Sequence, residues 1–170
     1  MNTRLIFATL LAAVAAPVLA QTPPPAAPRP PPARAPSMEL AVEAAQAAVA
    51  SCKASGYTVS VSVIDSAGVL KALVAADGAS KGAVDSATRK AATSLAFKEA
   101  SAVTQEKVKT DTALDARIKA DPGLFARAGG QPILVGTDVI GAIGVGGAPG
   151  GEKDDACAVA ALAKVQSRLK

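Results

Sequence analysis

The stretch GAIGVGGAPGGEKDDAC, residues 141–157, runs from an apolar strand through a glycine turn into a helix that opens with acidic residues. Its glycines allow positive φ angles and a close approach of the backbone to a neighbouring surface. Glu152, Asp154 and Asp155 lie where the free N–H groups and the dipole of a helix favour negative charge. Because carboxylates already occupy that end, the stretch argues against a phosphate cradle. It also fails the dinucleotide fingerprint, since Pro149 stands at the third glycine position.

Apolar residues preceding this stretch predict the first elements of the fold. Between Met38 and Cys52 they recur at helical spacing, which predicts a helix that Gly56 ends. Residues 58–63 alternate between Val and Thr or Ser, which predicts a strand with its valines on one side. An Asp-Ser-Ala-Gly turn then leads into a second strand over residues 69–74.

The second half of the chain repeats this combination of helices and a hairpin. Asp85 or Ser86 is expected to cap a helix that ends near Ala100, and residues 102–120 are expected to be helical. A second hairpin over residues 133–145 precedes the closing helix. The order α-ββ-α-α-ββ-α has hairpins in place of βαβ units. It therefore predicts an α+β fold, in which helices flank an antiparallel sheet of two hairpins.

Residues 1–20 have the pattern of a cleaved signal peptide, with Arg4 before an apolar run and a small-residue cleavage site before Gln21. We expect a periplasmic or secreted protein; a retained N-terminal anchor is the alternative. Residues 21–37 are rich in Pro and Ala, which predicts an extended linker, with a PxxP-type ligand as the alternative. Residues 38–170 suffice for one domain, and no membrane association is expected after signal cleavage.

The composition narrows the classes of partner. The chain is 50% hydrophobic but only 2% aromatic, so Ala, Val, Leu and Ile must build the core. Its net charge of +4 includes Arg4, Arg29 and Arg34, which precede the predicted domain and leave that domain close to neutral. Without a basic stripe or an aromatic stacking platform, the sequence argues against nucleic-acid binding.

Cys52 and Cys157 are placed on the first and last predicted helices. Export to an oxidising compartment favours a disulfide between them, and two buried thiols are the alternative. The absence of histidine excludes a Ser-His-Asp triad and histidine-ligated zinc or haem. The acid–base candidates that remain are Asp65, Asp77, Asp85, Asp154, Asp155, Lys90 and Tyr57. Lys90 and Asp65 are favoured slightly, because the hairpin and the helix are expected to converge there. The alternative interpretations are a snorkelling surface lysine and a structural turn residue.

Six short motifs occur in a fixed order along the chain. They are VIDSAG (63–68), DGA (77–79), RKA (89–91), GGQPI (129–133), GAIGV (141–145) and DDACA (154–158). This ordered set resembles the GlcG/HbpS family of haem-binding proteins, a domain type also found at the C-terminus of some cobalamin adenosyltransferases. The resemblance implies a profilin-like arrangement of an antiparallel sheet and helices, assembled into homo-oligomers.

Haem is the cofactor that this resemblance implies. The resemblance also places the ligand site near Asp65, Lys90, Gly129 and Gly130. Because the chain lacks histidine, a tight iron ligand would have to be Tyr57, a cysteine thiolate, Lys90 or a weak oxygen donor. Apolar contacts and pairing of the propionates with Lys or Arg would then hold haem weakly and exchangeably.

Three functions from different classes are consistent with these residues. The first is an exported protein that binds haem or another tetrapyrrole. The second is a non-catalytic accessory oligomer that binds an organic acid or a corrinoid. The third is an enzyme that uses Lys90 and a nearby aspartate.

Overall fold

The computed structural model describes residues 32–170. The predicted signal peptide (1–20) and residues 21–31 of the predicted linker lie outside the described residues. Four antiparallel strands form one sheet in the order β2-β1-β4-β3, so each predicted hairpin is present and β1 joins them through β4. The strands are β1 (Ser60–Asp65), β2 (Leu70–Ala75), β3 (Gly130–Val135) and β4 (Asp138–Gly146).

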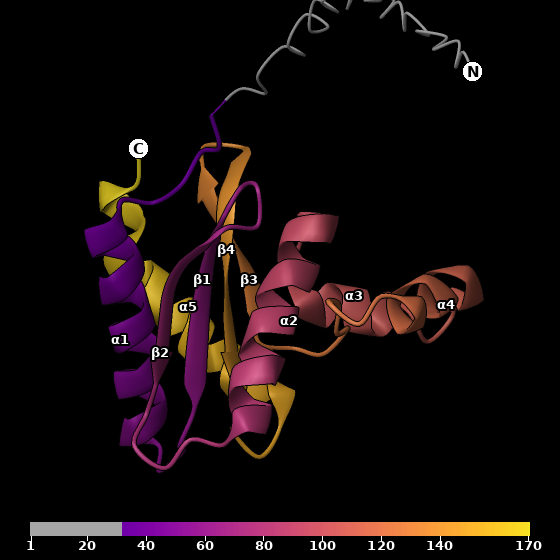
Figure 1. Ribbon diagram of the computed structural model, residues 1–170, viewed down its shortest axis with the longest axis horizontal. Helices are drawn as coiled ribbons and strands as arrows, with labels where there is room; N and C mark the ends of the chain where they lie inside the picture. The colour runs from indigo at the N-terminus through magenta and orange to yellow at the C-terminus, as the bar shows by residue number, and fades with distance from the viewer. Residues whose placement is uncertain (1–31) are drawn as a thin grey trace, which may run out of the picture. The chain divides into compact units, whose positions relative to one another are not determined.

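Helices cover both faces of the sheet, as Figure 1 shows. On one face α1 and α5 lie side by side, and on the other α2 packs against β4, β1 and β3. The bounds are α1 (Met38–Ala54), α2 (Lys81–Phe97), α3 (Ser101–Lys107), α4 (Thr112–Ala120), α5 (Gly151–Val165) and a 3-10 turn (Gln166–Arg168). This arrangement confirms the predicted α+β fold.

The segment predicted as helical over residues 102–120 forms two short helices, α3 and α4. Asp111 separates them, because its side chain accepts a hydrogen bond from the Leu114 N–H and caps α4. Together α3 and α4 extend away from the sheet, and we call them the arm (Figure 1).

The start of α2 differs from the sequence-based expectation of a cap at Asp85 or Ser86. Ser80 is the N-cap, and its hydroxyl accepts a hydrogen bond from the Ala83 N–H at 3.1 Å. Asp85 instead forms an exposed ion pair with Lys81, one turn earlier. The prediction was wrong because Ser80 satisfies the free N–H groups five residues earlier than expected.

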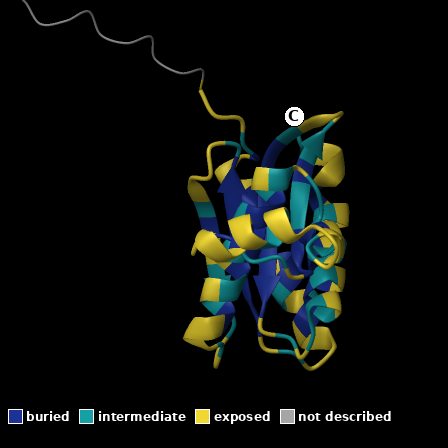
Figure 2. Ribbon diagram, turned by 90° about the vertical axis from the view of Figure 1, so that its right-hand side faces the viewer, coloured by how far each residue is buried: buried dark blue, intermediate teal, exposed yellow. Residues whose placement is uncertain are grey.

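Strand β1 is buried along its whole length, as the dark blue centre of Figure 2 shows. Its valines face the core beneath α1 and α5, whereas Ser60 and Ser62 face α2. Both serine hydroxyls are buried without a hydrogen-bond partner among the described residues. The hydroxyl face is therefore covered by a helix, which the alternation of Val and Ser did not indicate.

Glycines of β4 allow α2 to pack directly on the sheet. A Cβ atom at Gly144 would lie 2.1 Å from the Ala87 carbonyl oxygen, and one at Gly146 would lie 2.7 Å from the Ala83 oxygen. Neither distance leaves room for a side chain. Gly144 and Gly146 therefore set how closely α2 approaches this sheet.

A disulfide joins Cys52 of α1 to Cys157 of α5, with their Cα atoms 5.6 Å apart. This confirms the predicted pairing. At the N-terminal side, Arg34 of the predicted linker exchanges hydrogen bonds with Ser66 in the β1–β2 turn, and Pro36 is buried. The end of that linker is therefore docked on the domain. Among the described helices, none has the length and apolarity needed to cross a membrane.

Candidate functional site

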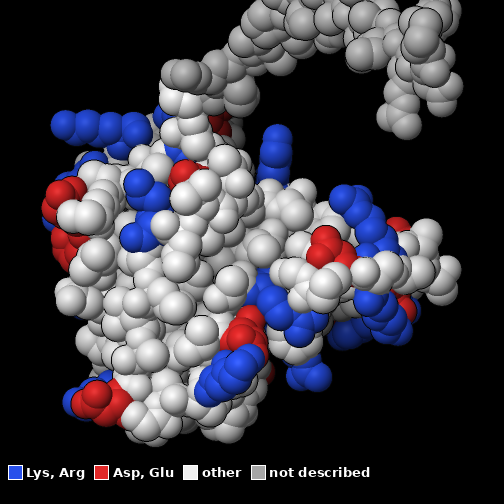
Figure 3. All heavy atoms as spheres, in the orientation of Figure 1, with Lys and Arg blue, Asp and Glu red and all other residues white. Residues whose placement is uncertain are grey.

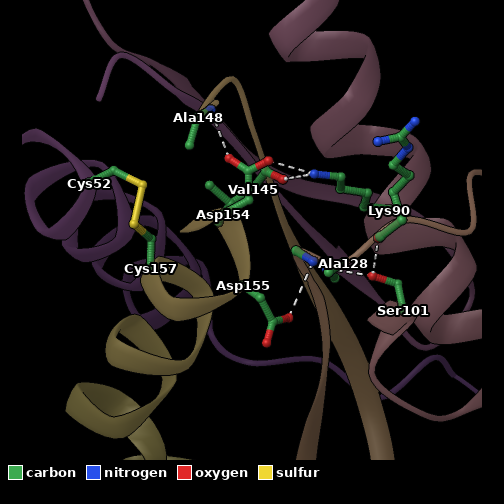
Figure 4. Close-up of polar contacts among 12 residues, drawn as sticks. Cys52, Lys90, Ser101, Ala128, Val145, Ala148, Asp154, Asp155 and Cys157 are labelled. Carbon is green, nitrogen blue, oxygen red and sulfur yellow. Dashed lines mark hydrogen bonds and ion pairs between the residues drawn. A yellow bond between two sulfur atoms is a disulfide. The ribbon is translucent and has the colours of Figure 1, made fainter. Parts of the chain in front are cut away.

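Lys90 of α2 and Asp154 of α5 form a buried ion pair beside the end of β4 (Figure 4). The Lys90 Nζ atom lies 2.6 Å from Asp154 Oδ2 and donates a second hydrogen bond to the Val145 carbonyl at 3.1 Å. The other carboxylate oxygen accepts the Ala148 N–H at 3.0 Å. Each charged side chain is only 3% exposed. The interpretation of Lys90 as a snorkelling surface residue is therefore wrong, because α2 directs it inward.

Burial raises the pKa of Asp154, since surroundings of low polarity disfavour the charged carboxylate. The hydrogen bond and the positive charge of Lys90 oppose this effect but do not cancel it. A titratable pair of this kind is typical of functional sites and also of structural ion pairs, so its surroundings must decide between the two.

Gly129 and Gly130 close around this pair from the start of β3. Gly129 has a φ of +120°, and a Cβ atom there would lie 2.9 Å from Lys90 Nζ. A Cβ atom at Gly130 would lie 2.2 Å from the Lys90 carbonyl oxygen. The Gly130 N–H donates to Ser101 Oγ at 2.8 Å, and Asp155 Oδ1 accepts the Gly129 N–H at 3.2 Å. Three of the predicted site residues, Lys90, Gly129 and Gly130, therefore lie together beside Asp154.

Asp65 does not join this cluster. Its carboxylate accepts hydrogen bonds from the Ala67 and Val69 N–H groups at 2.8 and 2.9 Å, and it thereby holds the β1–β2 turn. On the neighbouring strand it pairs with Gly141, whereas Lys90 bonds to Val145 further along that strand. The structure thus separates this predicted site residue from Lys90.

Tyr57 also lies apart from Lys90. It packs against the core beneath α1 and α5, on the opposite face of the sheet from α2. Lys153 Nζ lies 5.3 Å from the centre of its ring, and the residue lines a surface pocket of about 280 Å³ with Lys53 and Asp77.

A larger pocket, of about 500 Å³, lies between α2, the arm and the segment that leads into β3. We call it the arm pocket. It is lined by Arg89, Val108, Asp115, Ile118, Lys119, Leu124, Phe125, Ala126 and Arg127. One part of its wall is apolar, and the rest carries three cations and one carboxylate.

Two guanidinium groups lie near the ring of Phe125 in this pocket. The guanidinium carbon of Arg89 is 5.0 Å from the ring centre and that of Arg127 is 5.7 Å from it. Arg89 donates a hydrogen bond to the Leu124 carbonyl at 2.6 Å, and its buried Nε has no partner within the described part of the chain. Between residues 32 and 170, neither arginine pairs with a carboxylate. Figure 3 shows Lys and Arg atoms over the arm and near its junction with α2.

Comparison with known proteins identifies the family of this domain. Residues 37–163 match the family described as haem degrading protein HbpS-like. The chain belongs to the HbpS-like family. This confirms the resemblance noted from the sequence, and the family's description supports haem as the predicted cofactor.

Solved structures share this fold, and one of them is a structure of HbpS. A double mutant of HbpS from Streptomyces reticuli is 31% identical, with a TM-score of 0.73, over 85% of this chain and 98% of that one. ORFY from Klebsiella pneumoniae is 23% identical, with a TM-score of 0.74, over 85% of this chain and 99% of that one. A PduOC–haem complex is 23% identical, with a TM-score of 0.64, over 71% of this chain and 88% of that one. The last two show the fold alone, and no curated protein matches the chain.

The arm pocket of this HbpS-like chain was missed at the level of sequence. Arg89 was noted from the sequence only as part of a motif with Lys90, and Phe125 was not singled out. A usable signal was available in hindsight. In a chain that is 2% aromatic, a phenylalanine two residues before an arginine is a conspicuous pair. The second arginine of the pocket, Arg89, is 36 positions before Phe125, and only the fold brings it to the phenylalanine ring.

The residues of the arm pocket fit the organic part of haem. Its apolar wall suits the faces of a porphyrin, and its unpaired guanidinium groups suit the two propionates. Histidine is absent from the sequence, both cysteines form the disulfide, and Asp115 and Lys119 of the pocket wall pair with each other. The HbpS-like chain therefore fits the ring and carboxylates of haem better than its iron.

Proposed function

We propose that this chain is an exported haem-binding protein that holds haem weakly and exchangeably in the arm pocket. The observation that carries the proposal is the combination, in one pocket, of an apolar wall, an aromatic ring and two guanidinium groups without carboxylate partners. Membership of the HbpS-like family and the likeness to a PduOC–haem complex support haem as the ligand.

Each part of the pocket has a distinct task in this proposal. Ile118 and Leu124 are buried apolar residues that contact one part of the ligand, and Phe125 offers a stacking surface. Arg127 is exposed and Arg89 is half-buried, so the propionates would reach one guanidinium at the rim and one deeper in the wall. Haem supplies redox and oxygen chemistry wherever it is bound, but the tasks of these residues are binding and orientation.

Titration of the chain without residues 1–20 with haemin tests this proposal. We expect a saturable Soret shift at a defined stoichiometry. Arg127→Gln should weaken binding by at least about tenfold, since a hydrogen bond to a charged group contributes about 1.5–3 kcal/mol. Arg168→Gln is the matched control, because this arginine pairs with Glu43 away from the pocket. A spectrum of free haemin only, or equal affinity of the Arg127 variant, would contradict the proposal.

A smaller pocket favours a second candidate, the binding of a small organic acid. It has about 170 Å³ and lies against the Lys90–Asp154 pair, with Ser86, Arg127 and the glycines before α5 in its wall. Calorimetry with short carboxylic acids separates this candidate from the first. Binding of acids without binding of haemin would favour it.

Export and self-association are further parts of the proposal. The disulfide supports an oxidising compartment. Exposed apolar residues just before β2 and within it, namely Val69, Leu70 and Leu73, support contact with a second copy. Mass spectrometry of the secreted or periplasmic protein should find Gln21 as the first residue, and analytical ultracentrifugation should find a mass above the monomer. A protein that keeps residues 1–20 would contradict the cleaved signal peptide. A monomer at micromolar concentration would contradict self-association.

A further inference from the structure

Histidine, cysteine and methionine are the usual ligands of haem iron, and none of them is available in the arm pocket of this protein. The chain has no histidine. Both cysteines form the disulfide between α1 and α5, so neither offers a thiolate. Met38, the methionine of the described domain, begins α1, which packs on the face of the sheet opposite α2. None of these residues lines the arm pocket.

The two remaining candidates from the sequence are also unsuited to binding iron in this pocket. Lys90 is buried, and its ammonium group donates to both Asp154 and the Val145 carbonyl, so it would have to break a buried ion pair to bind iron. Tyr57 packs beneath α1 and α5 and lines a different pocket.

Within the arm pocket itself, the groups that could donate to iron are Asp115 and Lys119. They form an ion pair with each other, with 2.6 Å between Lys119 Nζ and Asp115 Oδ2. An arginine always keeps its proton and cannot donate electrons to a metal. The strongest features of the pocket are thus directed at the carboxylates and the ring of a porphyrin.

We infer that the arm pocket recognises the dicarboxylate porphyrin itself, without a bond from a protein side chain to the metal. The inference rests on the proposed function and specifies its ligand class, which is porphyrins with free propionates, whether metal-free or metal-bound. Affinity then comes from ring contacts and from the two guanidinium groups, which are the same for every member of this class.

The test compares haemin, iron-free protoporphyrin IX and the dimethyl ester of protoporphyrin IX. Absorption follows all three ligands, and the emission of the two iron-free porphyrins gives a second readout. We expect the dissociation constants of the first two to agree within about threefold, a factor worth about 0.6 kcal/mol. The ester should bind at least about tenfold more weakly, because it lacks the charges that the arginines pair with. Arg127→Gln should weaken haemin and protoporphyrin by the same factor. Asp115→Asn, which removes the carboxylate paired with Lys119, should likewise change the affinities for haemin and protoporphyrin by the same factor.

The outcomes separate this inference from the proposed function. If haemin binds more than tenfold more tightly than protoporphyrin, or if Asp115→Asn weakens haemin alone, a protein ligand to iron exists. The inference is then overturned, while haem binding by the chain stands. If neither porphyrin binds, both fail. An electron paramagnetic resonance spectrum of the haemin complex gives an independent readout, and we expect no nitrogen or sulfur ligand from the protein.

Discussion

Lys90 and Asp154 show how one residue pair constrains three elements at once. Lys90 holds α2 against the end of β4 through the Val145 carbonyl, and Asp154 holds the loop before α5 through the Ala148 N–H. Gly129 completes the arrangement because no side chain fits between the two charges. Removing one partner of such a pair leaves an uncompensated buried charge, which is the costly change.

Lys90→Met tests this directly. We expect the free energy of unfolding to fall by about 3–5 kcal/mol at neutral pH, because Asp154 remains buried without its cation. The double variant Lys90→Met with Asp154→Leu should recover a large part of that loss, since it buries no charge. Denaturant unfolding of the wild type, Lys90→Met, Asp154→Leu and the double variant measures all of these values. A double variant that loses the sum of the single effects would contradict an energetically coupled pair.

The cost of Lys90→Met should depend on pH. Burial raises the folded-state pKa of Asp154 above its value of about 3.9 in an unfolded chain, and loss of Lys90 removes the charge that opposes this. A raised folded-state pKa adds stability below the unfolded pKa, and this is lost as pH rises through the folded pKa. The stability gap between wild type and Lys90→Met should therefore widen from about pH 4 to pH 7. A gap that is constant over this range would show that Asp154 does not titrate there.

At the scale of elements, the contact of α2 with the sheet decides where the site lies. The glycines of β4 bring the helix backbone against the strand, and this places Lys90 at the strand's end and Arg89 beside the arm. The hydroxyl face of β1 is closed by the same contact. The arm pocket and the smaller pocket beside Lys90 therefore both depend on how α2 packs against β4.

Gly144→Ala should disturb this seating. The added methyl group would lie 2.1 Å from the Ala87 carbonyl oxygen, so α2 must move or the strand must bend. We expect a loss of about 1–3 kcal/mol in the free energy of unfolding. Gly82→Ala is the control, because its nearest neighbour is the Ser80 hydroxyl at 3.7 Å and alanine favours a helix. Equal melting temperatures of the two variants would contradict the close contact.

Ser80→Ala tests the observed start of α2. Its hydroxyl caps the Ala83 N–H, and loss of such a cap costs about 1 kcal/mol. Asp85→Ala, at the cap position that the sequence suggested, removes only an exposed ion pair with Lys81 and should cost about 0.5 kcal/mol or less. Thermal unfolding of both variants ranks them, and the reverse order would place the cap at residue 85.

At the scale of the whole molecule, the disulfide ties the first helix to the last across a sequence separation of 105 residues. It closes almost the entire domain into one loop. In the chain-entropy account, a loop of about 100 residues is worth at most about 4.7 kcal/mol, and measured values are usually smaller.

Replacing both cysteines with alanine should lower the free energy of unfolding by about 2–5 kcal/mol. Urea unfolding of the wild type with and without a reducing agent provides the parallel measurement, and the reduced protein should resemble the double variant. The same midpoint for oxidised and reduced protein would mean that the bond adds nothing to stability. Haemin affinity should not change, because neither cysteine lines the arm pocket.

The fold class, the two hairpins and the family could be predicted from the amino-acid sequence. The sequence favoured a bond between Cys52 and Cys157 but left two buried thiols as the alternative, which the structure resolves. Periodic apolar residues and glycine turns are local signals, and ordered motifs need no coordinates. It also indicated Lys90, Gly129 and Gly130, which do meet.

Which side chains are buried, and which of them become neighbours, follows from the folded arrangement alone. Lys90 and Asp154 are 64 residues apart, and Arg89 and Leu124 are 35 apart, so no local pattern joins them. Asp65 is the last residue of β1 and pairs with Gly141, whereas the Lys90–Asp154 pair lies near Val145 toward the other end of β4. The direction of each side chain follows from how α2 packs on β4. That packing depends on many contacts between residues that are distant in the sequence, and local sequence patterns do not indicate which residues these are.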